Sequence, residues 1–275
     1  MPHLYIFTLT WNALDRIAKL KNSLVPSLNN IDYTWLIKDN DSNDHTYDEM
    51  CLWGDMNVVP IKYKNNLQNF SEGMNFLFNE ASPKDDDLIL LLNNDVVFND
   101  TTSITKMMSL LKDDVGVVGS KLLYTNTNKL QHAGVIFENS HHMPIHYRDK
   151  EIDDAESEKN RLFQVVTGAV LLMRAGDYRG IFKNASGTCG MDENLRWAFD
   201  DVDLCLAVGL NMKKKIVYCG KTNIFHESSA SLKKNPVNRL FMTHNVAYLK
   251  RKWMKRYKLD GNLYRSNPKY NIYNG

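Results

Sequence analysis

The sequence has few cysteines, little net charge and no long apolar run, and each absence excludes a class of protein. The formal net charge of its 275 residues is only +2, so nothing global calls for nucleic acid or a membrane as a partner. No apolar run reaches the roughly 20 residues of a membrane-spanning helix, and no signal-peptide pattern precedes the first apolar run. The four scattered cysteines, none in a Cys-x-x-Cys pair, argue against a zinc knuckle or a disulfide scaffold: Cys51, Cys189, Cys205 and Cys219. We therefore expect a cytoplasmic protein that meets a membrane, if at all, at its surface.

The first half of the chain alternates short apolar runs with segments of helical spacing. Strands are predicted at 4–9, 33–38, 58–63, 88–92 and 116–124, with helices between them. Asn12 is expected to cap the first helix, Ser71 another, and Thr101 or Thr102 a third. This alternation, with an unbroken apolar run at 88–92, predicts an α/β protein with a largely parallel, doubly wound sheet.

Polar side chains follow three of these predicted strands. Asn12, Asp39 and Asp95 each come at the carboxyl end of an apolar run. In doubly wound sheets ligands bind at this edge, so the three residues are expected to lie around one site.

The second half is less regular. Residues 138–159 are polar and charged and are interpreted as a long loop or lid. The apolar segment 162–173 is interrupted by Thr167-Gly168-Ala169, and 215–218 is a predicted strand. A helix is expected to start near Asp200 and a basic amphipathic helix to cover 236–257, while the Asn- and Tyr-rich segment after Leu259 is expected to be weakly ordered.

Two acidic segments are candidates for metal binding and for general-base chemistry. Asp95, in Asn93-Asn94-Asp95, suits Mg²⁺ or Mn²⁺, because these cations often take one or two carboxylates plus phosphate and water; a plain turn explains the segment equally well. Asp201, in Asp200-Asp201-Val202-Asp203, suits a general base, and nearby Trp197 and Phe199 are expected to raise a carboxyl pKa by desolvation. Acidic residues in a first helical turn are also favoured by the helix dipole alone.

Histidines and a basic helix give weaker signals. His226 follows a strand, where an imidazole suits a metal or a phosphate. His132 is expected to pack near the site without a catalytic role, and the remaining histidines of the polar loop are interpreted as solvent-exposed or acceptor-facing: His141, His142 and His146. The basic 236–257 segment suits an anionic membrane surface or nucleic acid, although a solvated face explains it as well.

In order and spacing, these motifs resemble the family-two inverting glycosyltransferases with the GT-A fold, particularly their bacterial rhamnosyltransferase-like branch. The resemblance runs from about residue 4 to 250. The matching pieces are Thr10-Trp11-Asn12, Lys38-Asp39-Asn40-Asp41-Ser42, Asn65-Asn66-Leu67 through Gly73 and Asn75, Leu92-Asn93-Asn94-Asp95, Gln131-His132-Ala133-Gly134, Thr167-Gly168-Ala169, Met191-Asp192-Glu193, Phe199-Asp200-Asp201-Val202-Asp203-Leu204, and His226 before Ser228-Ser229. It implies a single GT-A domain over 1–258, with a nucleotide-binding half (1–125) and an acceptor-binding, catalytic half (126–258), followed by a tail (259–275).

The resemblance also implies roles. Asp201 would be the catalytic base of an in-line displacement with inversion. Five further residues would support this base or bind the acceptor: Asp200, Asp192, Glu193, Thr167 and Gly168. Asp95 and His226 would hold Mn²⁺ or Mg²⁺. Donor binding would involve Thr10, Asn12, Asp39, Asn66, Gly73, Asn75, Asn93 and Asn94, with Asp39 accepting from a uracil or thymine N–H, which favours a UDP- or dTDP-sugar.

Three departures from the family pattern stand out. The metal motif offers one carboxylate where the family has two, Gln68 replaces a common glycine, and Ala207 replaces a common arginine. A nearby lysine, Lys213, Lys214 or Lys215, is a candidate to supply that positive charge.

Two other functions are weighed against the transferase. A GT-A-like nucleotidyltransferase calls for a glycine-rich phosphate loop after the first strand, where this chain has Asn12-Ala13-Leu14-Asp15-Arg16. A non-catalytic carbohydrate-binding protein is disfavoured by the presence of both Asp95 and Asp201. The expected acceptor is a glycan or a lipid-linked sugar, with protein and nucleic acid left open, as is the oligomeric state.

Overall fold

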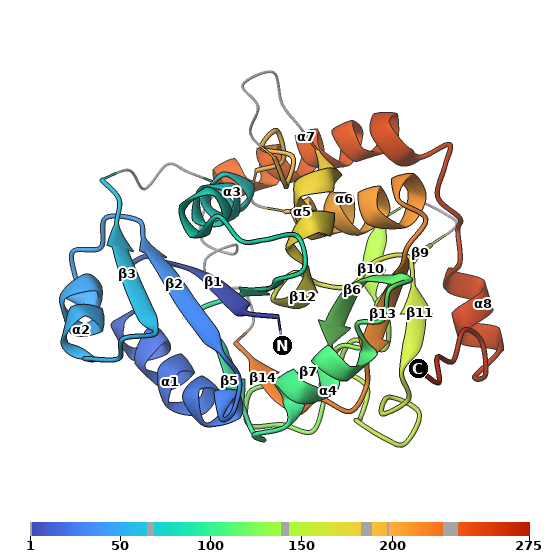
Figure 1. The fold of residues 1–275 in the computed structure, drawn as a ribbon. Coiled ribbons are helices and arrows are strands. Elements are labelled where there is room, and N and C mark those ends of the chain that lie inside the picture. Colours follow the sequence, from blue (N-terminus) through green and yellow to red (C-terminus); the bar gives the residue numbers. More distant parts are fainter. Residues whose placement is uncertain (1, 65–68, 139–142, 183–188, 197, 228–235) are drawn as a thin grey trace.

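The computed structural model describes residues 2–64, 69–138, 143–182, 189–196, 198–227 and 236–275 (Figure 1). Within these residues the main element is an eight-stranded mixed sheet in the order β11-β13-β6-β12-β4-β1-β2-β3. Only β12 and β11 run against the other strands. The strands are β1 (Leu4–Thr10), β2 (Tyr33–Asp39), β3 (Val58–Lys62), β4 (Leu88–Leu92), β6 (Val115–Ser120), β11 (Arg161–Phe163), β12 (Val170–Arg174) and β13 (Lys215–Cys219). The predicted strands at 4–9, 33–38, 58–63 and 88–92 are confirmed as β1, β2, β3 and β4, and so is the mostly parallel α/β sheet.

Two smaller sheets lie beside the large one. One has the order β5-β14-β7-β8, and the other pairs β9 with β10. Their strands are β5 (Val96–Phe98), β7 (Leu122–Tyr124), β8 (Leu130–His132), β9 (Val135–Phe137), β10 (Pro144–His146) and β14 (Ile224–His226). The predicted single strand over 116–124 is therefore two strands, β6 and β7, which belong to different sheets and meet at Lys121.

Helices cover both faces of the large sheet. Figure 1 shows α3, α5, α6 and α7 above it and α1 and α4 below it. The helical elements are α1 (Leu14–Leu24), η1 (Val25–Leu28), α2 (Thr46–Leu52), α3 (Phe70–Ala81), α4 (Ser103–Leu110), α5 (Ala175–Ile181), α6 (Asp200–Leu206), a π-helical turn η2 (Ala207–Asn211), α7 (Pro236–Trp253) and α8 (Gly261–Ser266).

The core has two parts, one on each face of the sheet, and β4 contributes to both. Its side chains alternate: Ile89 and Leu91 pack with the helices of one face, and Leu88, Leu90 and Leu92 with those of the other. All five are buried, which is why this strand is an unbroken apolar run.

Two predicted helix caps are wrong. The N-cap residue of α1 is Ala13, and Asn12 lies before it with a left-handed backbone (φ 45°). The Asp44 carboxylate instead accepts the Leu14 N–H at 3.3 Å, so a residue distant in sequence does the capping. The cap of α3 is Asn69, which forms a capping box with Glu72.

The segment after Leu259 is packed, contrary to the expectation of weak order. Tyr264 in α8 is 2% exposed and stacks on Phe163, with ring centroids 4.4 Å apart. The backbone of Asn271 accepts a hydrogen bond from Leu162 in β11 at 2.8 Å. The tail therefore covers the end of the large sheet at β11, because its aromatic side chains fill the space beside that strand.

The described part of the segment 138–159, interpreted as a loop or lid, includes the short strand β10. Its His141 and His142 lie outside the described residues, whereas His146 ends β10. The helix expected at 236–257 is α7, which ends at Trp253. Within the described residues, no helix combines the length and apolarity needed to cross a membrane.

Candidate active site

The ends of β1 and β2 form one wall of the candidate site. Thr10 pairs with Asp39 across these strands. Asn12 ties the two following loops together, because its backbone N–H donates to Ser42 Oγ at 2.8 Å and its Oδ1 accepts from the Asn43 N–H at 2.9 Å. The left-handed backbone of Asn12 places its amide for this contact.

The Asp39 carboxylate is fully buried at this wall, with one oxygen engaged and one not. Oδ1 accepts the Ser42 N–H at 2.9 Å, whereas the buried Oδ2 has no hydrogen-bond partner in the part of the chain that the structure describes. Leaving a buried carboxylate oxygen without a hydrogen bond costs free energy. A ligand N–H that donates to Oδ2 would therefore bind favourably.

The end of β4 brings together the residues predicted for the metal. Asn94 Nδ2 donates to Thr10 Oγ1 at 3.2 Å, which links β4 to β1. Asp95 Oδ1 lies 3.1 Å from His226 Nε2, and Asn93 Nδ2 lies 3.3 Å from the same nitrogen. The antiparallel pairing of β5 with β14 brings Asp95 and His226 side by side, and their role as metal ligands stays a prediction.

Gln131, which the sequence offered only as part of a motif, sets the orientation of the His226 ring. The Gln131 amide donates to the His226 backbone carbonyl at 3.2 Å, so its Oε1 is the atom that accepts from His226 Nδ1, at 2.5 Å. In a neutral ring Nε2 then carries a lone pair aimed at Asp95. Two lone-pair atoms 3.1 Å apart suit a shared cation, and this donor set fits a divalent metal completed by phosphate and water. Among the described residues, no cluster of three or more His, Cys, Asp or Glu side chains occurs that could hold a metal ion.

The acidic pair lies at the start of α6. The Gly168 N–H donates to Asp201 Oδ2 at 2.9 Å, and the Val202 N–H donates to Asp201 Oδ1 at 2.8 Å. Burial, and then the neighbouring Asp201 carboxylate, raises the pKa of Asp200 to about 7. Of the two aromatic residues expected to desolvate this pair, Phe199 precedes α6 with φ 66°, and Trp197 lies outside the described residues.

Asp192 and Glu193 lie in the segment between α5 and α6, and Asn75 of α3 holds this segment. Asn75 Nδ2 donates to the Met191 carbonyl and to Glu193 Oε1, both at 2.9 Å. Its Oδ1 accepts from Tyr178 Oη at 2.7 Å and from the Met191 N–H at 2.8 Å. Both donors and both acceptors of the amide are thus used within the protein.

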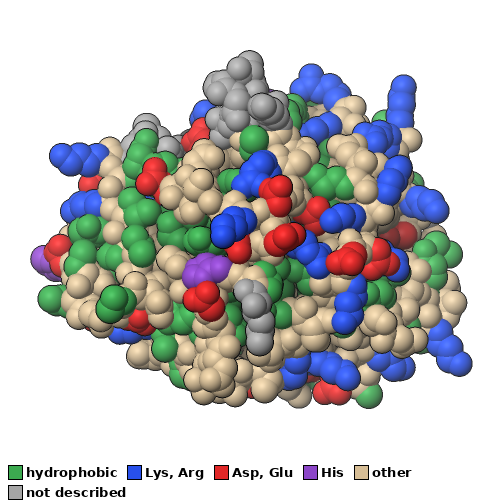
Figure 2. All heavy atoms as spheres, in the orientation of Figure 1, with side chains coloured by type: hydrophobic (Ala, Val, Ile, Leu, Met, Phe, Trp, Pro, Cys, Tyr) green, Lys and Arg blue, Asp and Glu red, His purple; other side chains and the backbone are tan. Residues whose placement is uncertain are grey.

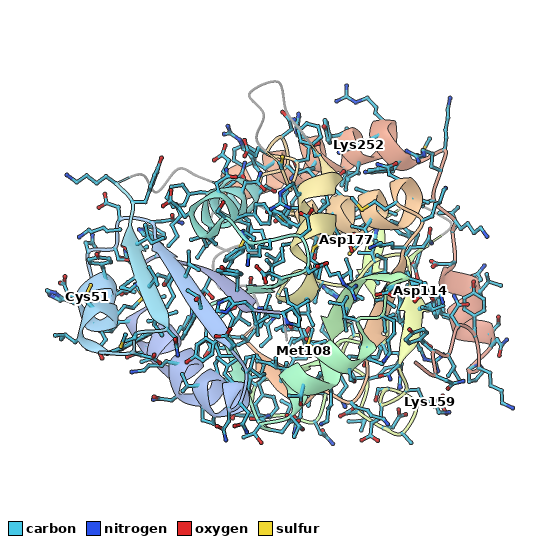
Figure 3. All side chains as sticks on the ribbon, viewed as in Figure 1. Cys51, Met108, Asp114, Lys159, Asp177 and Lys252 are labelled. Atoms are coloured by element: carbon cyan, nitrogen blue, oxygen red, sulfur yellow. The ribbon has the colours of Figure 1, made fainter. Side chains whose placement is uncertain are left out.

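Asp192 belongs to a buried charge network with α7. It accepts from Tyr248 Oη at 2.6 Å and from Lys252 Nζ at 2.8 Å. Lys252, labelled in Figure 3, also binds Asp203 at 2.9 Å, and Trp253 Nε1 donates to Asp203 at 2.6 Å. Sequence reasoning placed Lys252 on a solvated basic face; the spacing of Tyr248 and Lys252, four residues apart, is the signal that both reach one partner.

The remaining predicted residues have mixed placements. Gly73 allows α3 to pack on β1, since a Cβ there would lie 2.5 Å from Leu9 Cδ1. Asn66 lies outside the described residues. Two of the lysines proposed to replace a missing arginine are engaged elsewhere: Lys214 binds Asp177 at 2.7 Å, and Lys215 binds Asp114 at 2.5 Å (both partners are labelled in Figure 3).

The fold has clear relatives among solved structures, although no protein-family model and no curated protein sequence matches the chain. The structure of GalNAc-T7 with UDP, GalNAc and Mn²⁺ matches with a TM-score of 0.68 and 9% identity over 98% of this chain and 51% of that one. The mannosyltransferase PcManGT from Pyrobaculum calidifontis, in complex with GDP-Man and Mn²⁺, matches with a TM-score of 0.60 and 10% identity over 94% of this chain and 66% of that one. S. aureus TarS (residues 1–349) matches with a TM-score of 0.57 and 13% identity over 90% of this chain and 65% of that one.

This chain thus spans about two thirds or less of the length of each of these structures. At such low identity the likeness concerns the fold. The large, mostly parallel sheet and its flanking helices match the GT-A fold of these structures.

Proposed function

We propose that this chain is a nucleotide-sugar glycosyltransferase that uses a divalent metal and inverts the anomeric carbon of its donor. The observation that carries the proposal is the meeting of Asp95 and His226, whose facing lone-pair atoms lie 3.1 Å apart at the sheet edge. Solved structures of the same fold hold nucleotide sugars and Mn²⁺: GDP-Man with Mn²⁺ in PcManGT, and UDP-GlcNAc in TarS.

The donor would lie along the edge formed by β1, β2 and β4. The unsatisfied Asp39 Oδ2 would accept one ring N–H, such as that of uracil or thymine, and a UDP- or dTDP-sugar is the donor that we favour. Thr10, Asn12, Asn93 and Asn94 shape the wall between that oxygen and the Asp95–His226 pair. Asn75 has no free hydrogen-bonding capacity and would act by holding Glu193 in place.

Asp95 and His226 would hold Mn²⁺ or Mg²⁺ through one carboxylate oxygen and one ring nitrogen. When bound, the cation would offset the negative charge that develops on the leaving diphosphate. Gln131 keeps the His226 ring in the orientation that this ligand set needs.

Asp201 is the proposed general base. Its carboxylate would take the proton of an acceptor hydroxyl while that oxygen forms a bond to the anomeric carbon. The bond from this carbon to the diphosphate breaks at the same time, and its electron pair leaves with the diphosphate. Two backbone N–H groups hold the Asp201 carboxylate in position for this step.

A direct test compares the wild type with Asp201→Asn. Both proteins should bind the nucleotide diphosphate, whereas sugar transfer, followed by mass spectrometry, should fall about 10²- to 10⁴-fold in the variant. NMR of the product should show inversion at the anomeric carbon. Transfer at the wild-type rate by Asp201→Asn would remove Asp201 from its role, and a product with retained configuration would exclude the single displacement.

A further inference from the structure

The tail after Leu259 closes a second pocket, which the proposed mechanism does not use. Its volume is about 160 Å³. Its floor consists of side chains that are 3% exposed or less: Ala133, Ser157, Arg161, Tyr218 and Tyr264. Asp154, Glu156 and Arg265 also line it, and because about half of each of these side chains is exposed, they form its rim.

This pocket is separate from the proposed catalytic site. Arg161 and Tyr218 belong to β11 and β13, the first two strands in the order of the large sheet, whereas β1 and β2 are the sixth and seventh. Figure 1 shows β11 and α8 at one end of the molecule and β1, β2 and β3 at the other. The five strand spacings from β11 to β1 amount to roughly 24 Å. Among the described residues that line the pocket, none is proposed for the donor, the metal or the base.

Every arginine that lines the pocket is paired with a carboxylate. The pairs, at 2.7, 3.1 and 2.8 Å, are Arg148 with Asp154, Arg161 with Glu156 and Arg265 with Glu138. Arg148 holds Asp154 with two hydrogen bonds and has a left-handed backbone (φ 59°), which a residue other than glycine keeps only where its surroundings fix it. The wall therefore presents fixed donors and fixed acceptors side by side, with their charges already balanced.

Three tyrosines give the pocket its apolar surface. The hydroxyl group of Tyr147 donates to the Tyr264 carbonyl at 3.2 Å, and that of Tyr218 donates to the Ser157 carbonyl at 2.8 Å. The Tyr264 hydroxyl donates to the Leu162 carbonyl. Because all three hydroxyl groups are engaged with the backbone, the rings contribute aromatic surface to the wall.

A neutral sugar ring matches these features. The volume is close to the ~150 Å³ of a cavity that holds one benzene ring, so one six-membered ring fits. Each sugar hydroxyl can donate to a carboxylate and accept from a guanidinium, and the C–H face of the ring can pack on tyrosine. An anion would meet Asp154 and Glu156, and a cation would meet the arginines.

We propose that this pocket is a non-catalytic binding site for one neutral pyranose unit. The proposal does not rest on the transferase function, because binding here requires neither nucleotide nor metal. In a transferase the site would hold a distant unit of a glycan, which raises the effective concentration of that glycan at the catalytic site.

The test is calorimetry of the full chain, without nucleotide or metal, against methyl pyranosides of glucose, galactose, mannose, rhamnose and N-acetylglucosamine. Asp154→Asn keeps the Oδ1 that accepts the Glu156 and Ser157 N–H groups, and it should raise the Kd of the bound pyranoside about 10-fold. Arg265→Leu, at the rim, should raise it about 5-fold. Asp149→Asn, in the same segment but not lining the pocket, is the matched control and should bind as the wild type.

Two further measurements place the bound sugar. Nuclear Overhauser effects should join the sugar protons to isotope-labelled tyrosine rings, and Asp201→Asn should bind the pyranoside as the wild type does. Loss of binding in Asp201→Asn would place the sugar at the catalytic site and overturn the proposal. So would the absence of binding by every pyranoside, or a Kd unchanged in both Asp154→Asn and Arg265→Leu. A wild type that binds a pyranoside in this pocket but binds no nucleotide would support this inference and overturn only the proposed function.

Discussion

The backbone N–H of Gly168 donates a 2.9 Å hydrogen bond to Oδ2 of Asp201, which joins the turn before β12 to the first turn of α6. The two residues are also in close contact, since a Cβ on Gly168 would lie 3.1 Å from Asp201 Cβ. The position of the proposed base therefore depends on a residue 33 positions away that has no side chain.

Gly168→Ala should slow turnover more than it weakens donor binding. The added methyl group must displace Asp201 by a few tenths of an ångström, and small misplacements of reacting groups are costly to catalysis. Steady-state kinetics should show a fall in kcat of about 10-fold or more with a nearly unchanged donor KM. An unchanged kcat would show that the turn tolerates the methyl group and does not position the base. Gly209→Ala is a suitable control, because a Cβ there meets no atom closer than 3.8 Å.

Asp200→Asn should change how stability depends on pH. The pKa of Asp200 is about 7 in the folded protein against an ordinary 3.8, so between these values the folded state holds a proton that the unfolded state has lost. The free energy of unfolding contributed by this group therefore falls as pH rises from about 4 to about 7, and the full loss applies above pH 7. Asparagine does not titrate in this range, so the Asp200→Asn variant should not show this fall in the free energy of unfolding.

Urea titrations at pH 5 and pH 8 test this prediction. The stability of Asp200→Asn relative to wild type should be more favourable at pH 8 than at pH 5. Asp86→Asn, at an exposed position, should show no such trend. The same difference at both pH values for Asp200→Asn would contradict the raised pKa.

Lys252→Met should destabilise the protein strongly. The side chains of Asp192 and Asp203 are 0% and 2% exposed, and both would lose their cationic partner. Removing one partner of a buried ion pair lowers the free energy of unfolding by about 3–5 kcal/mol. The loss is expected to be smaller here, because 27% of the Lys252 side chain is exposed. Chemical denaturation should report the loss. Lys255→Met, on the exposed part of the chain after α7, should change stability by less than about 0.5 kcal/mol.

Gln131→Leu should weaken metal binding without removing a metal ligand. The leucine cannot accept from His226 Nδ1, so the ring loses the hydrogen bond that orients it. Such supporting contacts are typically worth about 10- to 100-fold in metal affinity. Electron paramagnetic resonance of Mn²⁺ titrated in the presence of UDP measures this affinity. Gln164→Leu, whose amide contacts Lys258 and Asp260 instead, should behave as the wild type. Equal affinities for Gln131→Leu and wild type would argue against His226 as a ligand.

The exposed basic residues of α7 have no part in the proposed catalytic mechanism. Figure 2 shows Lys and Arg side chains along the upper part of the molecule, where α7 lies in Figure 1. Arg251 in α7 is exposed, as are Lys255 and Arg256 just after the helix, whereas Lys252 binds Asp192 and Asp203. The expected contact of this helix with a membrane surface or an anionic acceptor stays a prediction.

The sheet and the polar residues at its strand ends could be predicted from the sequence, because both follow from local patterns. The apolar run of β4 and the polar residues after β1, β2 and β4 are read directly from the chain. Contacts between distant segments were not accessible in this way. Such contacts depend on the tertiary structure and leave no periodic pattern in the sequence. Examples are the capping of α1 by Asp44, the packing of Tyr264 on Phe163 and the contact between His132 and His146.

The most direct test of the account is a thermal-shift panel of UDP, dTDP, GDP and CDP, each with and without Mn²⁺ or Mg²⁺, on wild type and Asp95→Ala. A ligand that binds the native state raises the unfolding midpoint by mass action. The account predicts stabilisation by UDP or dTDP that requires the metal and is lost in Asp95→Ala. Absence of stabilisation by every nucleotide, or equal stabilisation of the variant, would contradict it.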